Sequence, residues 1–252
     1  MNVDESINEV ITIFDSMLEK YKPFNNTGKR KYYHSKEVAE ISMKLCKDLT
    51  TEKRLIMYII ALFHDIGRFE ENVTFNGLKD NNKFDHALQT ILIMNESNEI
   101  QSYLLKKNLY NKRKDIYASI YYHNKLIDNI KCNCDYLKIL RDADKISILR
   151  LVEKENLMSL NLKQPFSKNN LDDFYNRKCI NNTNIVTDSD KLLKYISFIY
   201  DINFKETTTE IETLVRKILD KVFLYSNNPL LDDLEKIYHY VELYFKTAKE
   251  ED

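Results

Sequence analysis

Glycine and proline are so scarce in this chain that it has few places at which to turn tightly. Three of each occur among 252 residues, whereas average usage of about 7% and 5% would supply roughly 30 in total. Antiparallel sandwiches and barrels need many tight turns, which these residues commonly make. All-β and collagen-like folds are therefore excluded, and a mostly helical chain is predicted.

Apolar residues recur at the three- and four-residue spacing of amphipathic helices. The segment 6–21 opens with a possible capping box and continues with such a stripe. The segment 51–66 is apolar nearly all round, which is typical of a helix buried at the centre of a domain. Gly67 follows it where a C-terminal glycine cap would lie. Further helices are predicted over 31–49, 83–94, 112–124, 134–159, 190–200, 205–225 and 230–246, and no stretch requires a strand.

Two segments interrupt the helical pattern. Residues 72–82 contain Gly77 and several asparagines, and residues 164–188 contain Pro165 and a second Asn-rich stretch. Both are predicted to be irregular, because these residue types favour turns and loops. The length suits one large domain or one domain with an appended part. We predict a helical core carrying the functional site over 1–160 and a C-terminal helical extension, packed on that core, over 161–252.

The charge balance argues against two classes of partner. Lysine and arginine number 38 against 39 aspartates and glutamates, so neither a nucleic-acid polymer nor an anionic membrane surface is expected as the main partner.

The N-terminus lacks the basic and apolar regions of a signal peptide. No apolar run approaches the roughly 18 residues of a membrane span. A cytoplasmic location is therefore expected.

The cysteines do not form a zinc-binding pattern. Cys46, Cys132, Cys134 and Cys179 include no repeated C-x-x-C pair of the kind that makes a structural zinc site. Free thiols are predicted, as in a reducing compartment.

A histidine and an aspartate follow the apolar helix directly. An acid placed after so apolar a run is costly to bury unless a metal ion or a partner compensates its charge. His64 and Asp65 thus indicate a site, although a local hydrogen bond between the two would explain the pair alone about as well.

Three further histidines are predicted to face inward or to lie beside an apolar helix. His34 and His123 are in phase with apolar residues of their helices, and His86 stands near the start of another. Each taken alone reads as an ordinary core histidine. Together with the His-Asp pair, in a chain with only five histidines, they favour a shared site. The fifth, His239, lies between tyrosines and is expected to be structural or exposed.

Two aspartates near the end of the predicted core lie close together in sequence. Asp142 and Asp144 are about 200° apart on a helix, so at most one faces a given site. Apolar residues accompany both. The helical phase alone therefore does not choose between them.

Taken in order, these motifs resemble the HD-domain superfamily of metal-dependent phosphohydrolases. LFHDIGRFEE resembles the HD helix and the loop after it, FDHA the third histidine segment, IYYHNK the fourth and LRDADKISIL the closing helix. The resemblance covers residues 31–151 and implies an all-α HD-domain helical bundle with additional C-terminal helices. The chain lacks the Gly-Tyr-Pro signature of the cyclic-di-GMP branch.

The resemblance also implies a ligand set and a cofactor. One or two divalent transition-metal ions are expected, because imidazoles and carboxylates suit Fe, Mn, Co, Ni or Zn better than calcium. Arg68 falls where members of the superfamily often carry a basic residue that binds phosphate. Lys125 and Lys145 are weaker candidates for positive charge at the entrance to the metal site. The implied first metal has His34, His64, Asp65 and Asp144 as ligands, and Asp65 bridges to a second metal held by His86 and His123.

The implied activity is hydrolysis of a small phosphorylated substrate. Metal-activated water would cleave a nucleotide or another phosphate mono- or diester, with Asp65 and Arg68 as the catalytic residues. Two alternatives remain open at this point. One is a di-iron oxygenase that uses the same ligands, and the other is a non-catalytic metal-binding module that senses or sequesters.

Overall fold

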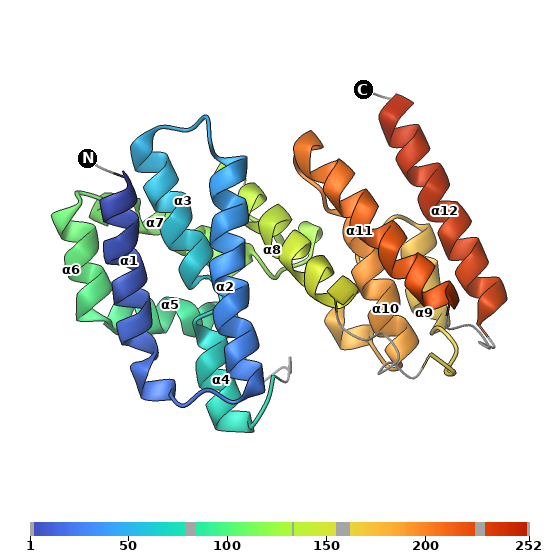
Figure 1. The fold of residues 1–252 in the computed structure, drawn as a ribbon, viewed down its shortest axis with the longest axis horizontal. Helices are drawn as coiled ribbons and strands as arrows, with labels where there is room; N and C mark the ends of the chain where they lie inside the picture. The colour runs from blue at the N-terminus through green and yellow to red at the C-terminus, as the bar shows by residue number, and fades with distance from the viewer. Residues whose placement is uncertain (1–2, 79–83, 133, 155–161, 225–229, 251–252) are drawn as a thin grey trace. The chain divides into compact units, whose positions relative to one another are not determined.

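Helices are the regular elements throughout the part of the chain that the structure describes (Figure 1). The computed structural model describes residues 3–78, 84–132, 134–154, 162–224 and 230–250. No extended strand occurs in these ranges, so the prediction of an all-α fold is confirmed. The chain divides into two compact units, Met1–Ser147 and Ile148–Asp252. The predicted division near residue 160 stays a prediction.

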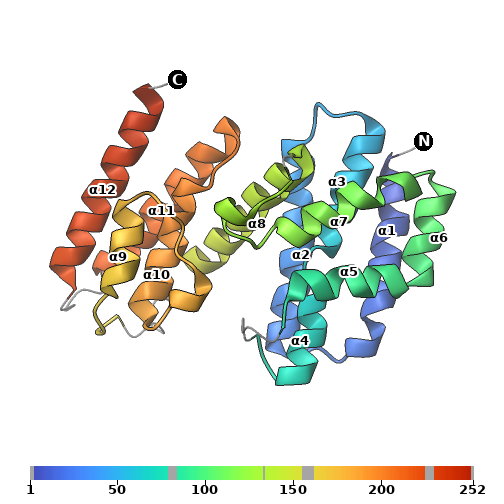
Figure 2. The same cartoon turned by 180° about the vertical axis from the view of Figure 1, so that it is seen from behind.

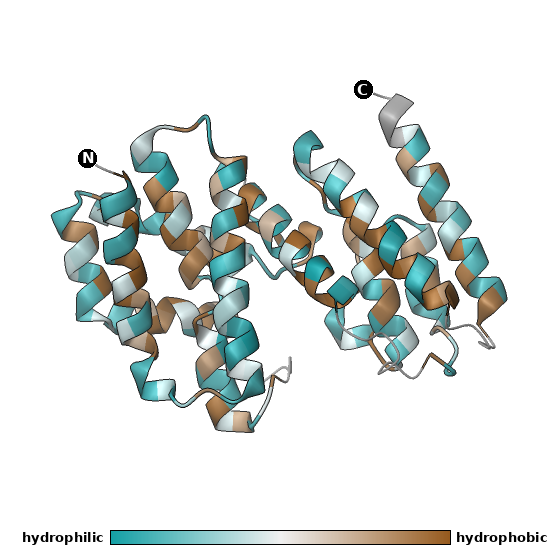
Figure 3. Ribbon diagram, viewed as in Figure 1, coloured by the Kyte–Doolittle hydropathy of each residue, from teal (hydrophilic) through white to brown (hydrophobic). Residues whose placement is uncertain are grey.

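The first unit is built around its most apolar helix, α3. Every residue of α3 from Leu55 to Phe63 is buried, and α3 packs between α1 and α2 (Figures 1 and 2). Apolar turns of α3 are brown in Figure 3. The helices of this unit are α1 (Val3–Leu18), α2 (Asn26–Leu45), α3 (Thr51–Phe63), α4 (Gly67–Phe75), α5 (His86–Glu96), α6 (Asn98–Lys106), α7 (Arg113–Tyr122) and most of α8 (Asp135–Lys154).

Gly67 begins a helix and does not cap one, which corrects the prediction from sequence. It is the first residue of α4, where a Cβ atom would lie 2.3 Å from the carbonyl oxygen of His86 and 2.9 Å from the amide nitrogen of Thr90. Glycine is therefore required because α5 passes very close to this backbone. The Gly67 amide donates to Thr90 Oγ1 at 2.9 Å, and that hydroxyl donates to the carbonyl of His64 at 3.1 Å.

Both segments predicted to be irregular contain a helix. Residues 72–75 form the last turn of α4, which ends where Asn76 adopts a left-handed conformation. Residues 79–83 lie outside the described ranges. Within 164–188 the structure has α9 (Lys168–Tyr175), a short helix whose Phe174 is fully buried. α6, which begins after the Ser97 cap, was also not predicted from the sequence.

The second unit packs its helices through aromatic residues. Phe174 lies 5.4 Å from the ring of Tyr200 and 5.7 Å from that of Tyr240, measured between centroids. Buried Asp190 accepts hydrogen bonds from the backbone and hydroxyl of Ser167 at 2.8 and 2.7 Å, and this ties the start of α10 to the segment before α9. The remaining helices are α10 (Asp188–Ile196), α11 (Lys205–Leu224) and α12 (Leu231–Glu250).

Two further observations bear on the expectations from sequence. All four cysteines are free thiols. Within the described ranges, no helix is both long enough and apolar enough to cross a membrane.

Candidate metal centre

Five helical segments bring the six predicted ligand residues to one place in the first unit. The centre combines the middle of α2, the ends of α3 and α7, the start of α5 and the middle of α8. A helical bundle commonly builds a metal site in this way, from side chains on facing helices. The six residues are His34, His64, Asp65, His86, His123 and Asp144.

The two oxygen atoms of Asp65 face two different sets of histidines. Oδ2 lies 3.8 Å from Nε2 of His34 and 3.7 Å from Nε2 of His64. Oδ1 lies 3.4 Å from Nε2 of His86 and 3.8 Å from Nε2 of His123. The carboxylate thus stands between two groups of imidazoles with one oxygen toward each.

Asp144 belongs to the group around His34 and His64. Its Oδ1 lies 3.0 Å from Nε2 of His34 and 3.7 Å from Nε2 of His64. Asp142 is fully buried but is not in any of the ligand groups found among the described residues. The fold therefore places Asp144, and not Asp142, in a group with the histidines.

Hydrogen bonds at the far side of two rings determine their tautomers. Nδ1 of His64 lies 2.7 Å from the carbonyl oxygen of Ala61, and Nδ1 of His123 lies 2.5 Å from that of Ile120. A carbonyl oxygen only accepts, so Nδ1 carries the proton in both rings. Nε2 of each ring then points into the centre, toward Asp65.

His34 is held through a side-chain relay. Its Nδ1 lies 2.9 Å from Oγ of Ser147, and that hydroxyl donates to Oε2 of Glu37 at 2.8 Å. Because the only hydroxyl proton of Ser147 is directed to Glu37, Nδ1 of His34 must be the donor to Ser147. The relay therefore leaves Nε2 of His34 facing the carboxylates of Asp144 and Asp65. A partner on the outer ring nitrogen commonly orients a metal-binding histidine and increases its basicity.

The ring of His86 differs from the other three in having the side-chain amide of Asn124 as a partner. Nδ2 of Asn124 lies 3.3 Å from Nε2 of His86 and 3.5 Å from its Nδ1. His86 is also the first residue of α5, whose N-cap Asp85 accepts from the amides of Ala87 and Leu88. The cap thereby determines where the ring enters the centre.

Burial favours the neutral form of His64 and His86, whereas nearby charges keep the carboxylates of Asp65 and Asp144 ionised. Burial lowers the pKa of His64 to about 4, and burial followed by the charge of Arg68 lowers the pKa of His86 well below its ordinary value. Burial opposes ionisation of Asp65, yet Lys31 and His64 bring its pKa well below the usual range. Burial likewise opposes ionisation of Asp144, but its pKa is lowered by His34. These are the protonation states that a metal ion requires of its ligands.

The residues present fit a divalent metal ion. Three overlapping groups each place their candidate ligand atoms within 4.8 Å of one another. Nε2 of His64 is buried and makes no hydrogen bond to any described residue, although such an atom normally has a partner. Imidazoles together with carboxylates form a donor set that suits transition metals. The three groups are His34, His64 and Asp65; His64, His123 and Asp144; and Asp65, His86 and His123.

Two cationic side chains lie beside Asp65. Nε of Arg68 is 3.8 Å from Oδ1 of Asp65, and its NH1 donates to buried Glu71 at 2.8 Å. Nζ of Lys31 is 2.7 Å from Oδ2 of Asp65, a contact that sequence analysis missed. Lys125 and Lys145 were the weaker candidates for positive charge at the site. Lys125 pairs with Asp85 at 2.5 Å, and buried Lys145 donates to the Arg141 carbonyl.

Ser147, Glu37 and Lys31 each have a helical spacing that could have revealed them. Ser147 lies three residues after Asp144, whereas Glu37 lies three after His34 and Lys31 three before it. Residues three apart share a helix face. Arg141 had no comparable signal, because its NH1 binds the carbonyls of Tyr122, His123 and Lys125 at the end of another helix.

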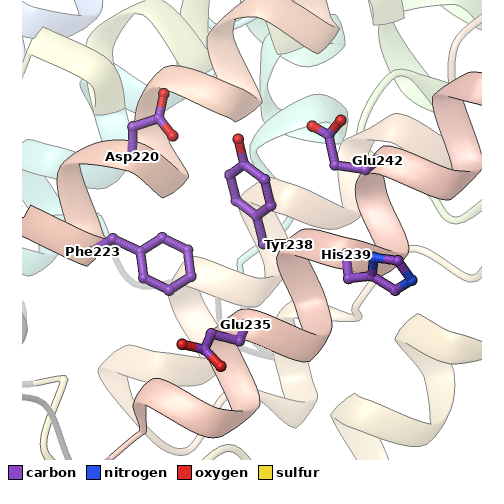
Figure 4. Close-up of a pocket in the computed structure, with 6 residues that line it drawn as sticks. All are labelled: Asp220, Phe223, Glu235, Tyr238, His239 and Glu242. Carbon is purple, nitrogen blue, oxygen red and sulfur yellow. The ribbon is translucent and has the colours of Figure 1, made fainter.

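A separate hollow of about 400 Å³ lies between α11 and α12 in the second unit (Figure 4). It contains three acids and two aromatic rings beside exposed His239. None of the six residues of the metal centre lines it. The lining residues are Asp220, Phe223, Glu235, Tyr238, His239 and Glu242.

Comparison with known proteins identifies one domain. The family model described as "HD domain" matches residues 32–149, a stretch that includes all six residues of the centre. No curated protein and no solved structure matches the chain.

Proposed function

Residues 32–149 form an HD domain, a family made up mostly of metal-dependent hydrolases, and we propose that this protein is a metal-dependent phosphohydrolase. Its substrate would be a nucleotide or another small phosphate ester. The observation that carries the proposal is the arrangement at Asp65, whose two oxygens face separate histidine groups.

In this proposal the six side chains hold up to two divalent ions. When bound, such ions supply an activated water and neutralise the charge that develops on a phosphate ester. Asp65 is shared between the two groups. His34, His64 and Asp144 complete the first group, and His86 and His123 complete the second.

The protein's own contribution is orientation and charge. Main-chain carbonyls hold the rings of His64 and His123, and the Ser147–Glu37 relay holds the ring of His34. Arg68 is anchored by Glu71 beside Oδ1 of Asp65. A guanidinium so anchored can bind phosphate oxygens without first losing much conformational freedom, and we assign it that role.

The test is a hydrolysis screen with defined metals. Purified protein would be loaded with Mn, Co, Ni or Mg and offered nucleotides, cyclic dinucleotides and sugar phosphates, with release of phosphate or shortened product as the readout. Turnover is expected with at least one redox-inert metal. Asp65→Ala should lose both metal and activity, whereas His239→Ala should keep both.

The same preparations distinguish the other classes. Oxygen consumption that requires iron, without phosphate release, would identify an oxygenase. Metal binding without turnover of any substrate would favour a sensing or sequestering module. Undiminished metal content in Asp65→Ala would show that the ligand assignment is wrong.

A further inference from the structure

A lysine forms an ion pair with the oxygen of Asp65 that the first metal would use. Nζ of Lys31 lies 2.7 Å from Oδ2 of Asp65. The same oxygen faces Nε2 of His34 at 3.8 Å and Nε2 of His64 at 3.7 Å. The ammonium group therefore already neutralises the carboxylate at this position.

Charge makes the ammonium and a metal ion competitors. Both would lie within a few ångströms of one carboxylate oxygen in a largely buried site, where repulsion between cations is weakly screened. An ion bound through Oδ2 would take the place of the lysine on Asp65. Arg68 is not in this position, because it lies on the Oδ1 side and is anchored by Glu71.

Side-chain exposure shows where a displaced ammonium has room. The side chains of Lys31 and Asp144 are 20% and 18% exposed, against 4% for Asp65 and 0% for His64. The centre is therefore most open to solvent beside Lys31 and Asp144. Lysine has a flexible stem, so its charged end can move toward water while the helix stays in place.

We propose that Lys31 competes with the first metal for Asp65 and, once displaced, contacts the anionic substrate at the open side of the centre. The second part rests on the proposed function, because it takes the substrate to be a phosphate ester. Lys31 thus raises the metal concentration needed to load the centre and lowers the phosphate concentration needed to occupy it. The two effects have opposite signs, and a merely structural lysine would not produce them together.

The first experiment measures metal affinity alone. Manganese is titrated calorimetrically into metal-free native protein and into Lys31→Met. The variant should bind manganese at least about tenfold more tightly, because it lacks the competing charge. Lys31→Arg, which keeps the charge, should remain close to the native affinity.

Lys36→Met is the matched control, because Lys36 lies on the same helix and contacts Tyr32, away from the centre. It should leave the manganese affinity unchanged. An affinity of Lys31→Met equal to or below that of the native protein would overturn the competition.

The second experiment titrates inorganic phosphate into the manganese-loaded proteins. Lys31→Met should bind phosphate about threefold or more weakly, since an exposed charge contact of this kind contributes modestly. Lys36→Met should match the native protein. Phosphate affinity that is unchanged or tighter in Lys31→Met would overturn the contact with the substrate.

Neither measurement requires turnover, so failure of the hydrolysis screen and failure of this proposal are distinguishable. Far-UV circular dichroism of each variant verifies the fold. If Lys31→Met does not fold without metal, because Asp65 loses its counter-charge, Lys31→Gln provides the same two comparisons with a polar side chain. The expected signs and the overturning results are the same for that variant.

Discussion

Nδ1 of His34 hydrogen-bonds to a side chain, that of Ser147, whereas Nδ1 of His64 and of His123 hydrogen-bonds to a main-chain carbonyl. Ser147→Ala removes the acceptor of His34 Nδ1 and separates Glu37 from the ring. We expect the affinity for the first metal to fall by about ten- to a hundredfold, since outer partners of metal-binding histidines have effects of this size. Calorimetric titration with manganese would measure it.

Two variants control for effects of packing. Ser119→Ala also deletes a buried hydroxyl, but this one donates to the carbonyl of Asp115 and lies outside the relay. It should leave the metal affinity unchanged. Ser147→Thr keeps the hydroxyl and should recover most of the binding. Equal losses in Ser147→Ala and Ser119→Ala would contradict a role for the relay.

The two neighbouring aspartates should respond differently to loss of charge. Asp144→Asn keeps the shape of the side chain but removes the anion beside His34 and His64, so metal affinity and turnover should fall strongly while the fold survives. Asp142→Asn should affect metal binding far less. Metal content measured by elemental analysis would rank the two variants, and the reverse order would show that Asp142 is the ligand.

At the scale of elements, the close contact between α4 and α5 positions His86. Gly67→Ala would place a Cβ atom 2.3 Å from the His86 carbonyl oxygen, so the two helices must move apart. We expect a loss of about 1–3 kcal/mol in the free energy of unfolding, as is typical of overpacking, together with weaker binding of the second metal. Urea denaturation and metal titration would measure the two effects.

Gly28→Ala is the comparison for that substitution. Its Cβ would lie 3.2 Å from Cβ of Phe24, which is a side-chain atom, and alanine favours the helix by about 1 kcal/mol. The change in stability should therefore be smaller than for Gly67→Ala. A similar loss in both variants would mean that the α4–α5 contact is not the cause.

The long helices could be predicted from sequence, whereas three short ones, α4, α6 and α9, could not. α3 is apolar nearly all round and α11 carries an apolar stripe over several turns, and patterns of this length are a strong signal of a helix. α6 and α9 are short and rich in polar residues, so their stability depends on contacts with residues distant in sequence, such as those of Tyr103 with Ser6 and of Phe174 with Tyr240. Gly67 was misread because glycine serves both as a cap and where two backbones come close.

At the scale of the whole molecule, the buried histidines make the stability of the metal-free protein depend on pH. The pKa of His64 is about 4 in the folded protein against an ordinary 6.5, and that of His86 is lowered as well. The unfolded chain therefore takes up protons as the pH falls through about 6.5, while the folded chain does so only near 4. Stability is full above pH 6.5 and is lost toward pH 4, by about 3 kcal/mol for His64 alone.

Urea denaturation in the presence of a chelator, at several pH values between 7.5 and 4.5, would measure this loss. His64→Gln removes the titrating group and should reduce the slope. His239→Ala alters an exposed residue outside the centre and should follow the native profile. A flat profile of the native protein between pH 6.5 and 4.5 would contradict the expectation.

The identity of the candidate site could be predicted from sequence, but its internal arrangement could not. The order of the motifs was enough to select His34, His64, Asp65, His86, His123 and Asp144, which the fold brings together. The choice of ring nitrogen depends on the carbonyls of Ala61 and Ile120 and on Ser147. Hydrogen-bond partners of this kind depend on three-dimensional geometry, which the order of motifs does not specify.

α8 belongs to both compact units, and this affects how the chain can be dissected. The boundary falls after Ser147, whereas α8 continues to Lys154. In an α-helix the amides of residues 148–151 donate to the carbonyls of residues 144–147. A fragment cut at the boundary would leave those carbonyls, including that of Asp144, at a frayed helix end. The unit that holds the metal centre therefore ends inside a helix. Residues from the first turn of the second unit are needed to keep Asp144, its last candidate ligand, within a hydrogen-bonded helix.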